Sequence, residues 1–194
     1  MYDDGTFTPI DFPGATSTSP IGINDNGQIV GWYTTGTRSG NFLYSGGVYT
    51  ALAIPGLVYG INDAGQIVGI YGTLQGTTQG FLLTGDSYTT ISYPGAYQTF
   101  AYGLNDNGQV VGQYQSSFNG DDYGFLYSAG SYITIDPGTE TQPTGINDLG
   151  QITGGAGHLG FIATPVPAPE PSSFSLVSLC SGLLASLFLR NRPV

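Results

Sequence analysis

The stretch GINDNGQIVGWY, residues 22–33, decides the fold because the chain repeats it three more times. It returns as GINDAGQIVGIY at 60–71, as GLNDNGQVVGQY at 103–114 and as GINDLGQITGGA at 145–156. The first Asn of each copy lies 38, 43 and 42 residues after the one before it. A motif that returns at a nearly fixed period indicates a repeat architecture. The sequence therefore predicts four structural units of about 40 residues each.

Each unit contains short stretches rich in Val, Ile, Tyr and Phe, which favour strands. In the third copy we expect strands at 99–105, 109–115, 123–128 and 131–135. Four antiparallel strands in about 40 residues have the size of a propeller blade, and one such sheet cannot bury its apolar face alone. We expect an all-β, propeller-like array of four four-stranded repeats. Its packed faces would be formed by Ile23, Ile61, Leu104, Ile146, Val30, Val68, Val111, Phe42, Phe81, Phe125 and Phe161.

The sequence leaves two forms of this array open. In one, residues 2–10 complete the fourth unit and close a four-bladed ring. In the other, the repeats are part of a larger propeller in a longer chain. An open stack of hairpins ranks third, because its sheet edges would need protection.

The repeated Asn-Asp-x-Gly predicts a hairpin turn, with a type I turn followed by a glycine at positive φ. Carboxylates repeated around one rim could instead bind calcium. Each turn offers only one carboxylate, so we prefer the turn and predict no metal and no cofactor. The turn residues are Asn24, Asp25, Gly27, Asn62, Asp63, Gly65, Asn105, Asp106, Gly108, Asn147, Asp148 and Gly150.

The chain divides into three segments. The repeat domain, 1–165, is followed by a proline-rich linker at 166–171 with the sequence VPAPEP. Residues 172–189 carry no charge, which predicts a transmembrane helix. Arg190 and Arg192 follow in the basic tail of the last segment, 172–194, and predict a cytoplasmic carboxyl terminus with the repeats outside.

The order Pro169-Glu170-Pro171, apolar segment, terminal arginines resembles the PEP-CTERM sorting signal of Gram-negative bacteria. The resemblance covers residues 167–194 and implies recognition and cleavage by an exosortase, with transient membrane anchoring and release to the cell surface or matrix. Separately, the repeated motif resembles the HAF family of extracellular repeats. The His-Ala-Phe that names that family is replaced here by Asn41-Phe42 and by three Gly-Phe pairs.

The composition excludes several functions. Three arginines, no lysine and a formal net charge of -10 make nucleic acid an unfavourable partner. The single cysteine, Cys180, excludes an internal disulfide, and the single histidine, His158, excludes a site built from several histidines. Asp121 and Asp122 form an acidic pair that we interpret as solvated.

The prediction that follows is a non-enzymatic surface or matrix protein whose repeats serve as a binding or structural module. A polysaccharide-binding module is the first alternative, because aromatic side chains beside amides commonly bind sugars. The aromatic residues that follow the hairpin are Trp32, Tyr33, Tyr71 and Tyr114. A hydrolase or lyase acting on exopolysaccharide is a weaker alternative, since it needs an acid/base pair that the sequence does not reveal.

Overall fold

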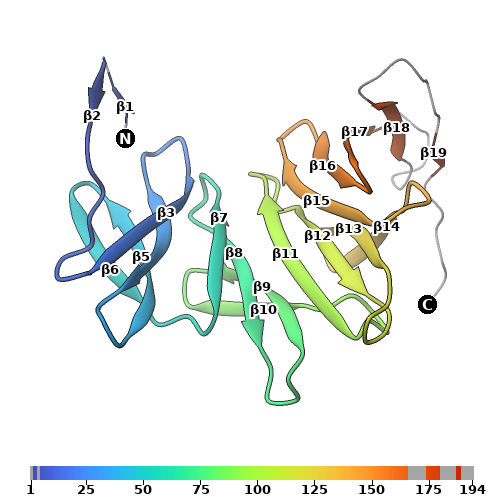
Figure 1. Cartoon of the computed structure of the whole chain (residues 1–194). Helices are drawn as coiled ribbons and strands as arrows, with labels where there is room; N and C mark the ends of the chain where they lie inside the picture. Colours follow the sequence, from blue (N-terminus) through green and yellow to red (C-terminus); the bar gives the residue numbers. More distant parts are fainter. Residues whose placement is uncertain (1, 4, 166–173, 180–186, 189–194) are drawn as a thin grey trace.

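The four copies of the motif fold into four separate antiparallel sheets (Figure 1). The structure is a computed structural model that describes residues 2–3, 5–165, 174–179 and 187–188. In every sheet the strands follow one another in chain order, as in a meander. This order needs only short hairpin connections, which the repeated turn residues provide.

The strands have the following bounds. The first sheet holds β3 (Ser17–Ile23), β4 (Ile29–Thr34), β5 (Ser39–Ser45) and β6 (Val48–Leu52). The second holds β7 (Leu57–Ile61), β8 (Ile67–Gly72), β9 (Thr78–Thr84) and β10 (Ser87–Ile91). The third holds β11 (Gln98–Leu104), β12 (Val110–Gln115), β13 (Asp122–Ser128) and β14 (Ser131–Ile135). The fourth holds β15 (Thr141–Ile146), β16 (Ile152–Ala156), β17 (Leu159–Pro165), β18 (Phe174–Leu179) and β19 (Leu187–Phe188).

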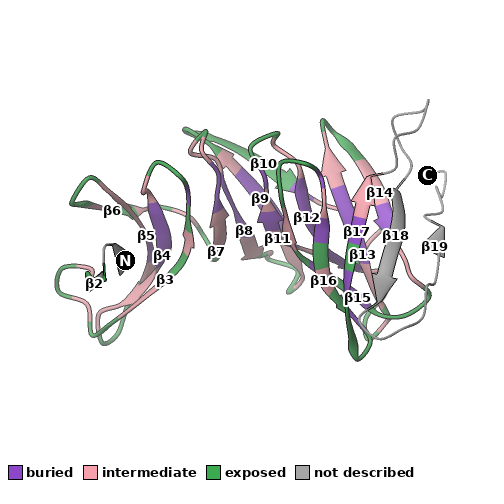
Figure 2. Ribbon diagram, turned by 90° about the horizontal axis from the view of Figure 1, so that it is seen from above, coloured by how far each residue is buried: buried purple, intermediate pink, exposed green. Residues whose placement is uncertain are grey.

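The sheets are arranged in a row, with the first and the fourth at opposite ends (Figures 1 and 2). The first strand of each later sheet packs on the sheet before it. Thus β7 contacts β3 and β4, β11 contacts β7, β8 and β9, and β15 contacts β11, β12 and β13. This stacking of whole four-stranded units is what the repeat period predicts.

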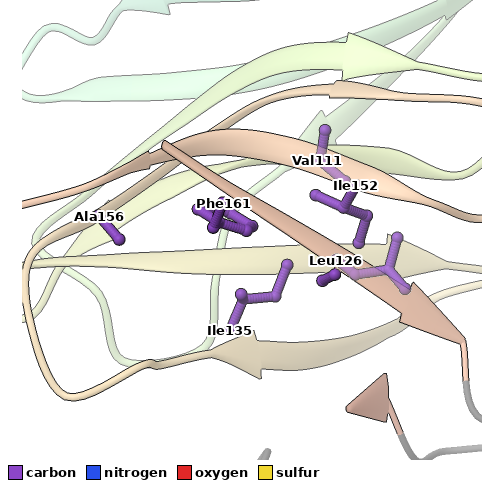
Figure 3. Close-up of a cluster of buried hydrophobic side chains, with 7 residues drawn as sticks. Val111, Leu126, Ile135, Ile152, Ala156 and Phe161 are labelled. Atoms are coloured by element: carbon purple, nitrogen blue, oxygen red, sulfur yellow. The ribbon is translucent and has the colours of Figure 1, made fainter. Parts of the chain in front are cut away.

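Hydrophobic clusters fill the junctions between neighbouring sheets. Figure 3 shows the junction between the third and fourth sheets, where Val111 and Leu126 pack with Ile152 and Phe161. The predicted valines and phenylalanines are buried, which confirms most of the expected packed faces. Ile23 is an exception: 59% of it is exposed, whereas its equivalent Ile61 is 7% exposed. The reason is that no four-stranded sheet precedes the first one in the described part of the chain.

The predicted closure into a four-bladed ring is not found. The amino-terminal strands β1 (Tyr2–Asp3) and β2 (Thr6–Phe7) pair with each other, and β17 pairs with β18. Gly5 has φ +83° and lets the amino-terminal residues turn back on themselves. A short hairpin of this kind costs less loop-closure entropy than pairing with a strand more than 150 residues away. The described sheets therefore form an open row.

The carboxyl-terminal segment also differs from the prediction. Within 172–189 the described residues lie in β18 and β19, so the helix is not borne out for them. No helix in the described part of the chain is long and apolar enough to cross a membrane. A physical reason lies in β17, whose outer edge lacks the fourth repeat-derived strand that β6, β10 and β14 supply in the other sheets. An unpaired strand edge is a template for further pairing, and β18 occupies it.

Candidate functional site

The repeated Asn-Asp-x-Gly-Gln forms the same hairpin turn in all four sheets. In the first turn the Asn24 carbonyl accepts from the Gly27 N–H at 3.0 Å, and the Asn24 N–H donates to the Gln28 carbonyl at 3.1 Å. Gly27 has φ +71°, and its three equivalents lie between +72° and +74°. This geometry, a type I turn followed by a left-handed glycine, confirms the turn predicted from the sequence.

The side chain of the turn asparagine is fixed by the glutamine that ends the motif. Asn24 Oδ1 accepts from the Gln28 N–H at 2.9 Å, and Asn24 Nδ2 donates to Gln28 Oε1 at 2.8 Å. The same pair of bonds recurs in the other three turns. One Nδ2 hydrogen then remains for a partner outside the turn.

That remaining hydrogen links neighbouring sheets. Asn24 Nδ2 donates to the Asn62 carbonyl at 2.8 Å, and Asn62 Nδ2 donates to the Asn105 carbonyl at 3.0 Å. Asn105 Nδ2 continues the series to the Asn147 carbonyl at 2.9 Å. The first three asparagines are 8%, 4% and 4% exposed, so these bonds are shielded from water. Buried amide hydrogen bonds are costly to leave unmade.

The aspartates form a parallel series. The Asp25 N–H donates to Asp63 Oδ1 at 2.7 Å, the Asp63 N–H to Asp106 Oδ1 at 2.7 Å, and the Asp106 N–H to Asp148 Oδ1 at 2.8 Å. We call these two series of bonds, which run through the four turns, the hairpin ladder. Bonds from a backbone N–H to a carboxylate are charge-assisted. Each carboxylate that receives one thus acts as a structural acceptor.

The hairpin ladder changes the interpretation of the repeated carboxylates. The sequence leaves open whether they surround a rim that could hold calcium. They lie instead one after another along the row, and the last three accept a backbone N–H from the preceding turn. Across the described residues, no group of three or more His, Cys, Asp or Glu side chains could hold a metal ion.

A glycine before each turn lets the neighbouring sheets approach. A Cβ atom added to Gly60 would lie 2.9 Å from Leu104 Cδ2. One added to Gly103 would lie 2.8 Å from the Thr144 carbonyl oxygen and 3.2 Å from Gly145 Cα. Each of these glycines follows a register shift in the first strand of its sheet. Close contact between the first strands therefore requires the Gly of Gly-Ile/Leu-Asn-Asp.

Sequence reasoning missed both the ladder and the role of this glycine. A type I turn with a bulge needs Asn and Gly but has no need of a fixed Gln or of a Gly before the Ile or Leu. Both residues nevertheless recur in all four copies. Their recurrence was the available signal that the motif does more than turn the chain.

Three of the aromatic side chains considered for sugar stacking are engaged by other protein groups. Tyr33 stacks on Phe12 with ring centroids 3.8 Å apart, and Tyr114 stacks on Tyr93 at 3.7 Å. The hydroxyl of Tyr71 donates to Gln79 Oε1 at 2.9 Å. Tyr71 and Tyr114 also belong to the hydrophobic clusters between the sheets.

Trp32 lies in a different setting. It is half-buried and lines a hollow of about 550 Å³ together with Asn41, Ile54, Pro55 and Leu57. Asn41 is 2% exposed, and its Nδ2 donates to the Ile54 and Gly56 carbonyls at 3.2 and 2.9 Å. Asn41 Oδ1 is buried and has no hydrogen-bond partner among the described residues. The hollow thus combines an aromatic ring with an unsatisfied amide acceptor.

The acidic pair borders another hollow. Asp121 and Asp122 line about 390 Å³ together with Asp136 and Glu140. Asp122 Oδ1 is buried without a hydrogen-bond partner in the described part of the chain. No cationic side chain lines this hollow, so all of its ionisable carboxyl groups are acidic.

Of the other residues considered in the sequence, only His158 lies in the described part of the chain. His158 is exposed in the turn between β16 and β17. Pro169, Glu170, Pro171, Arg190 and Arg192 lie outside the described residues, as does Cys180. The chain matches no family model, and comparisons with curated proteins and with solved structures find no significant match.

Proposed function

We propose that the protein is a non-enzymatic cell-surface or matrix component of a Gram-negative bacterium, with the repeat row as its structural module. The observation that carries this proposal is the hairpin ladder. The Asn, Asp and Gln side chains that recur most regularly form hydrogen bonds within and between repeats. Their chemistry is thereby used to hold neighbouring sheets together, and it does not converge on a substrate.

Delivery to the surface is proposed to depend on the carboxyl-terminal signal. The sequence Pro169-Glu170-Pro171 precedes an uncharged segment and terminal arginines. An exosortase-type enzyme would recognise this motif, cut the chain near it and release the repeats. Until that cut, the apolar segment would hold the chain in the membrane.

The acidic surface fits this location. The formal net charge of -10 opposes binding to nucleic acid and keeps copies of the protein apart at low ionic strength. The row of four sheets is proposed to be part of a propeller-like assembly, whose further sheets would pack on its two ends.

The sorting proposal is tested by Glu170→Ala in the full chain, produced in a bacterium that has an exosortase. We expect the variant to stay uncut in the membrane fraction while the unaltered chain is cut and released. Glu140→Ala is the matched control, because Glu140 and Glu170 are the only glutamates of the chain. If the Glu170 variant were cut and released like the control, the sorting role would be wrong. Breakdown of matrix polysaccharide by the purified chain would contradict the non-enzymatic role.

A polysaccharide-binding module is the second candidate function, and the hollow beside Trp32 favours it. An indole ring can stack on a sugar, and the unpaired Asn41 Oδ1 could accept from a hydroxyl after a small side-chain movement. For a polysaccharide that the unaltered chain binds, Trp32→Ala should reduce the affinity of the full chain at least about tenfold. Phe118→Ala, which removes an aromatic ring that is 73% exposed outside this hollow, should leave binding unchanged. If both variants bound the polysaccharide equally well, the hollow beside Trp32 would be excluded as the binding site.

A further inference from the structure

The last turn of the row has ladder donors that bond to no following sheet among the described residues. Asn147 Nδ2 donates to Gln151 Oε1 at 2.8 Å, but the described part of the chain has no following turn whose carbonyl could accept its second hydrogen. The Asp148 N–H likewise has no acceptor among the described residues. Asn147 is exposed, in contrast to the buried asparagines of the other turns. We call this surface of the fourth sheet the tail face.

The tail face also has an apolar hollow where a following strand would pack. The hollow has a volume of about 350 Å³ and is lined by Gly145, Ile146, Asn147, Thr153 and Ile162, among others. Ile162 is 50% exposed, whereas its equivalents Leu82 and Leu126 are 8% and 1% exposed. At the second and third junctions the first strand of the next sheet contacts the strand that carries Leu82 or Leu126.

The opposite end of the row carries the complementary groups. In the first sheet, Ile23 is 59% and Ile21 is 46% exposed. The Asp25 carboxylate receives no N–H from the described residues, unlike the carboxylates of the three later turns. The Asn24 carbonyl accepts one bond, from Gly27, and has a second lone pair available. We call this surface of the first sheet the head face.

We propose that the tail face of one copy of this chain binds the head face of a second copy, so that the proteins associate head to tail. The proposal rests on the structural role proposed above and specifies its partner as a second copy. Asn147 Nδ2 and the Asp148 N–H would donate to the Asn24 carbonyl and the Asp25 carboxylate of the second copy. The contact then repeats the hydrogen bonds of the three internal junctions.

The apolar groups match in the same way. In the first junction Ile61 belongs to the cluster that includes Val30 and Leu43 of the preceding sheet. Ile23 of a second copy would pack in the same manner against Thr153 and Ile162. Gly145 permits this approach, because a Cβ added there would meet only Thr153 Cγ2, at 3.2 Å, within its own chain. Its equivalent Gly103 faces the backbone of the next sheet.

A head-to-tail contact joins two different surfaces, so it forms a ring if the rotation closes and a filament if it does not. The net charge of -10 opposes the contact. Added salt shortens the Debye length from about 30 Å at 0.01 M to about 8 Å at 0.15 M. Association should therefore strengthen as salt is raised over this range.

The test is sedimentation velocity of the full chain over a range of concentrations, with one variant for each face. Gly145→Leu fills the tail hollow, and Ile23→Asp places a carboxylate on the head face. Each variant should weaken self-association at least about tenfold. The controls are Gly72→Leu, at a strand glycine with open space around it, and Val48→Asp, at a valine that is 64% exposed outside the two faces. Both should associate like the unaltered chain, and circular dichroism should show the same strand content in all five proteins.

Mixing the two face variants gives a sharper result. Gly145→Leu keeps an intact head and Ile23→Asp keeps an intact tail, so the mixture should form a one-to-one dimer that grows no further. The proposal is overturned if the unaltered chain stays monomeric up to its solubility limit, if the face variants associate as strongly as the controls, or if the mixture forms no dimer. None of these outcomes depends on cleavage at Pro169-Glu170-Pro171, so they leave the sorting proposal unaffected.

Discussion

Asn105 and Asn147 occupy the same position of the same motif, in the third and fourth turns, but their surroundings differ. The two turns have nearly the same backbone, with φ of +72° at Gly108 and +74° at Gly150. Asn105 is 4% exposed and its side chain bonds to the next sheet, whereas Asn147 is exposed and its side chain bonds only inside its own turn. The motif therefore has two separable roles: it turns the chain, and it joins sheets where a following sheet is present.

The two positions should differ most in their effect on the free energy of unfolding when each asparagine is replaced by alanine. Asn105→Ala leaves the Gln109 N–H and Gln109 Oε1 without their partner, and it removes the inter-sheet bond to the Asn147 carbonyl, which keeps only the Gly150 N–H. With one unsatisfied buried group costing about 1–3 kcal/mol, we expect the free energy of unfolding to fall by about 3 kcal/mol. Asn147→Ala should lower it by about 1 kcal/mol, because water can reach the groups that it releases.

Urea unfolding of both variants, at a protein concentration where the chain is monomeric, gives the comparison. The slope of the unfolding free energy against urea should match that of the unaltered chain, which would show that the same surface unfolds. Equal losses at the two positions would mean that the inter-sheet bond of Asn105 contributes nothing to stability.

Gly103 and Gly145, the glycines before these two turns, should also differ in how much their replacement lowers stability, but by a smaller amount. Gly103→Ala directs a methyl group at the backbone of the fourth sheet, and overpacking of this kind costs about 1–3 kcal/mol. Gly145→Ala meets only the side chain of Thr153, which can move, so the loss should be below about 0.5 kcal/mol. Thermal unfolding of the two variants measures both effects. A Gly145 variant as unstable as the Gly103 variant would show that the glycine serves its own sheet and not the junction.

The sequence predicted the features that repeat within one unit. The third-copy strands agree with the structure to within one residue at each end, and the turn conformation follows from Asn and Gly alone. These features are local, because turn chemistry and strand propensity act over a few residues.

Features that depend on what lies beside a unit were not predictable in this way. The bonds from one turn to the next connect residues 38 to 43 positions apart, and nothing in a single copy specifies them. Closure of the ring depends on the rotation between successive sheets, which the period does not encode. The strand at Phe174–Leu179 depends on the free edge of β17, whereas hydropathy alone favours a membrane helix.

Tyr102 gives a pH-dependent way to examine the third sheet's junctions, because it contacts Tyr59 of the second sheet and Gln142 of the fourth. Its ring lies edge-on to Tyr59 with centroids 5.3 Å apart, and the equivalent position of the fourth sheet is Thr144. Burial raises the pKa of Tyr102 to about 12, against a smaller opposing effect of its hydrogen bond with Gln142. The folded state thus holds the phenolic proton more tightly than the unfolded state, whose tyrosines titrate near 10.

The sign of the stability effect follows from this difference. Below about pH 10 both states are protonated and stability does not change through this group. Between about pH 10 and 12 the unfolded state releases the proton first, so stability falls as pH rises. Tyr102→Phe should show a shallower fall in melting temperature over this range than the unaltered chain. Parallel curves would show that Tyr102 titrates alike in both states.

The smallest effect is expected at Ala129, in the turn between β13 and β14. Ala129 has φ +48°, whereas Gly46 and Gly85 hold the equivalent position in the first and second sheets with φ of +56° and +57°. A left-handed conformation costs a residue with a Cβ about 1 kcal/mol, and glycine removes this cost but gains freedom in the unfolded chain. Ala129→Gly should therefore stabilise the protein by less than about 1 kcal/mol.

Gly85→Ala is the matched reverse change, because no other atom lies within 4 Å of its added Cβ and only the backbone conformation is altered. It should destabilise the protein by a similar amount, measured as a shift of the urea midpoint. Neither turn contains a ladder residue, so each effect should stay the same in an Asn105→Ala background. If either effect changed there, the turns would be coupled to the junctions, and the separation of turning from joining would not hold for the whole repeat.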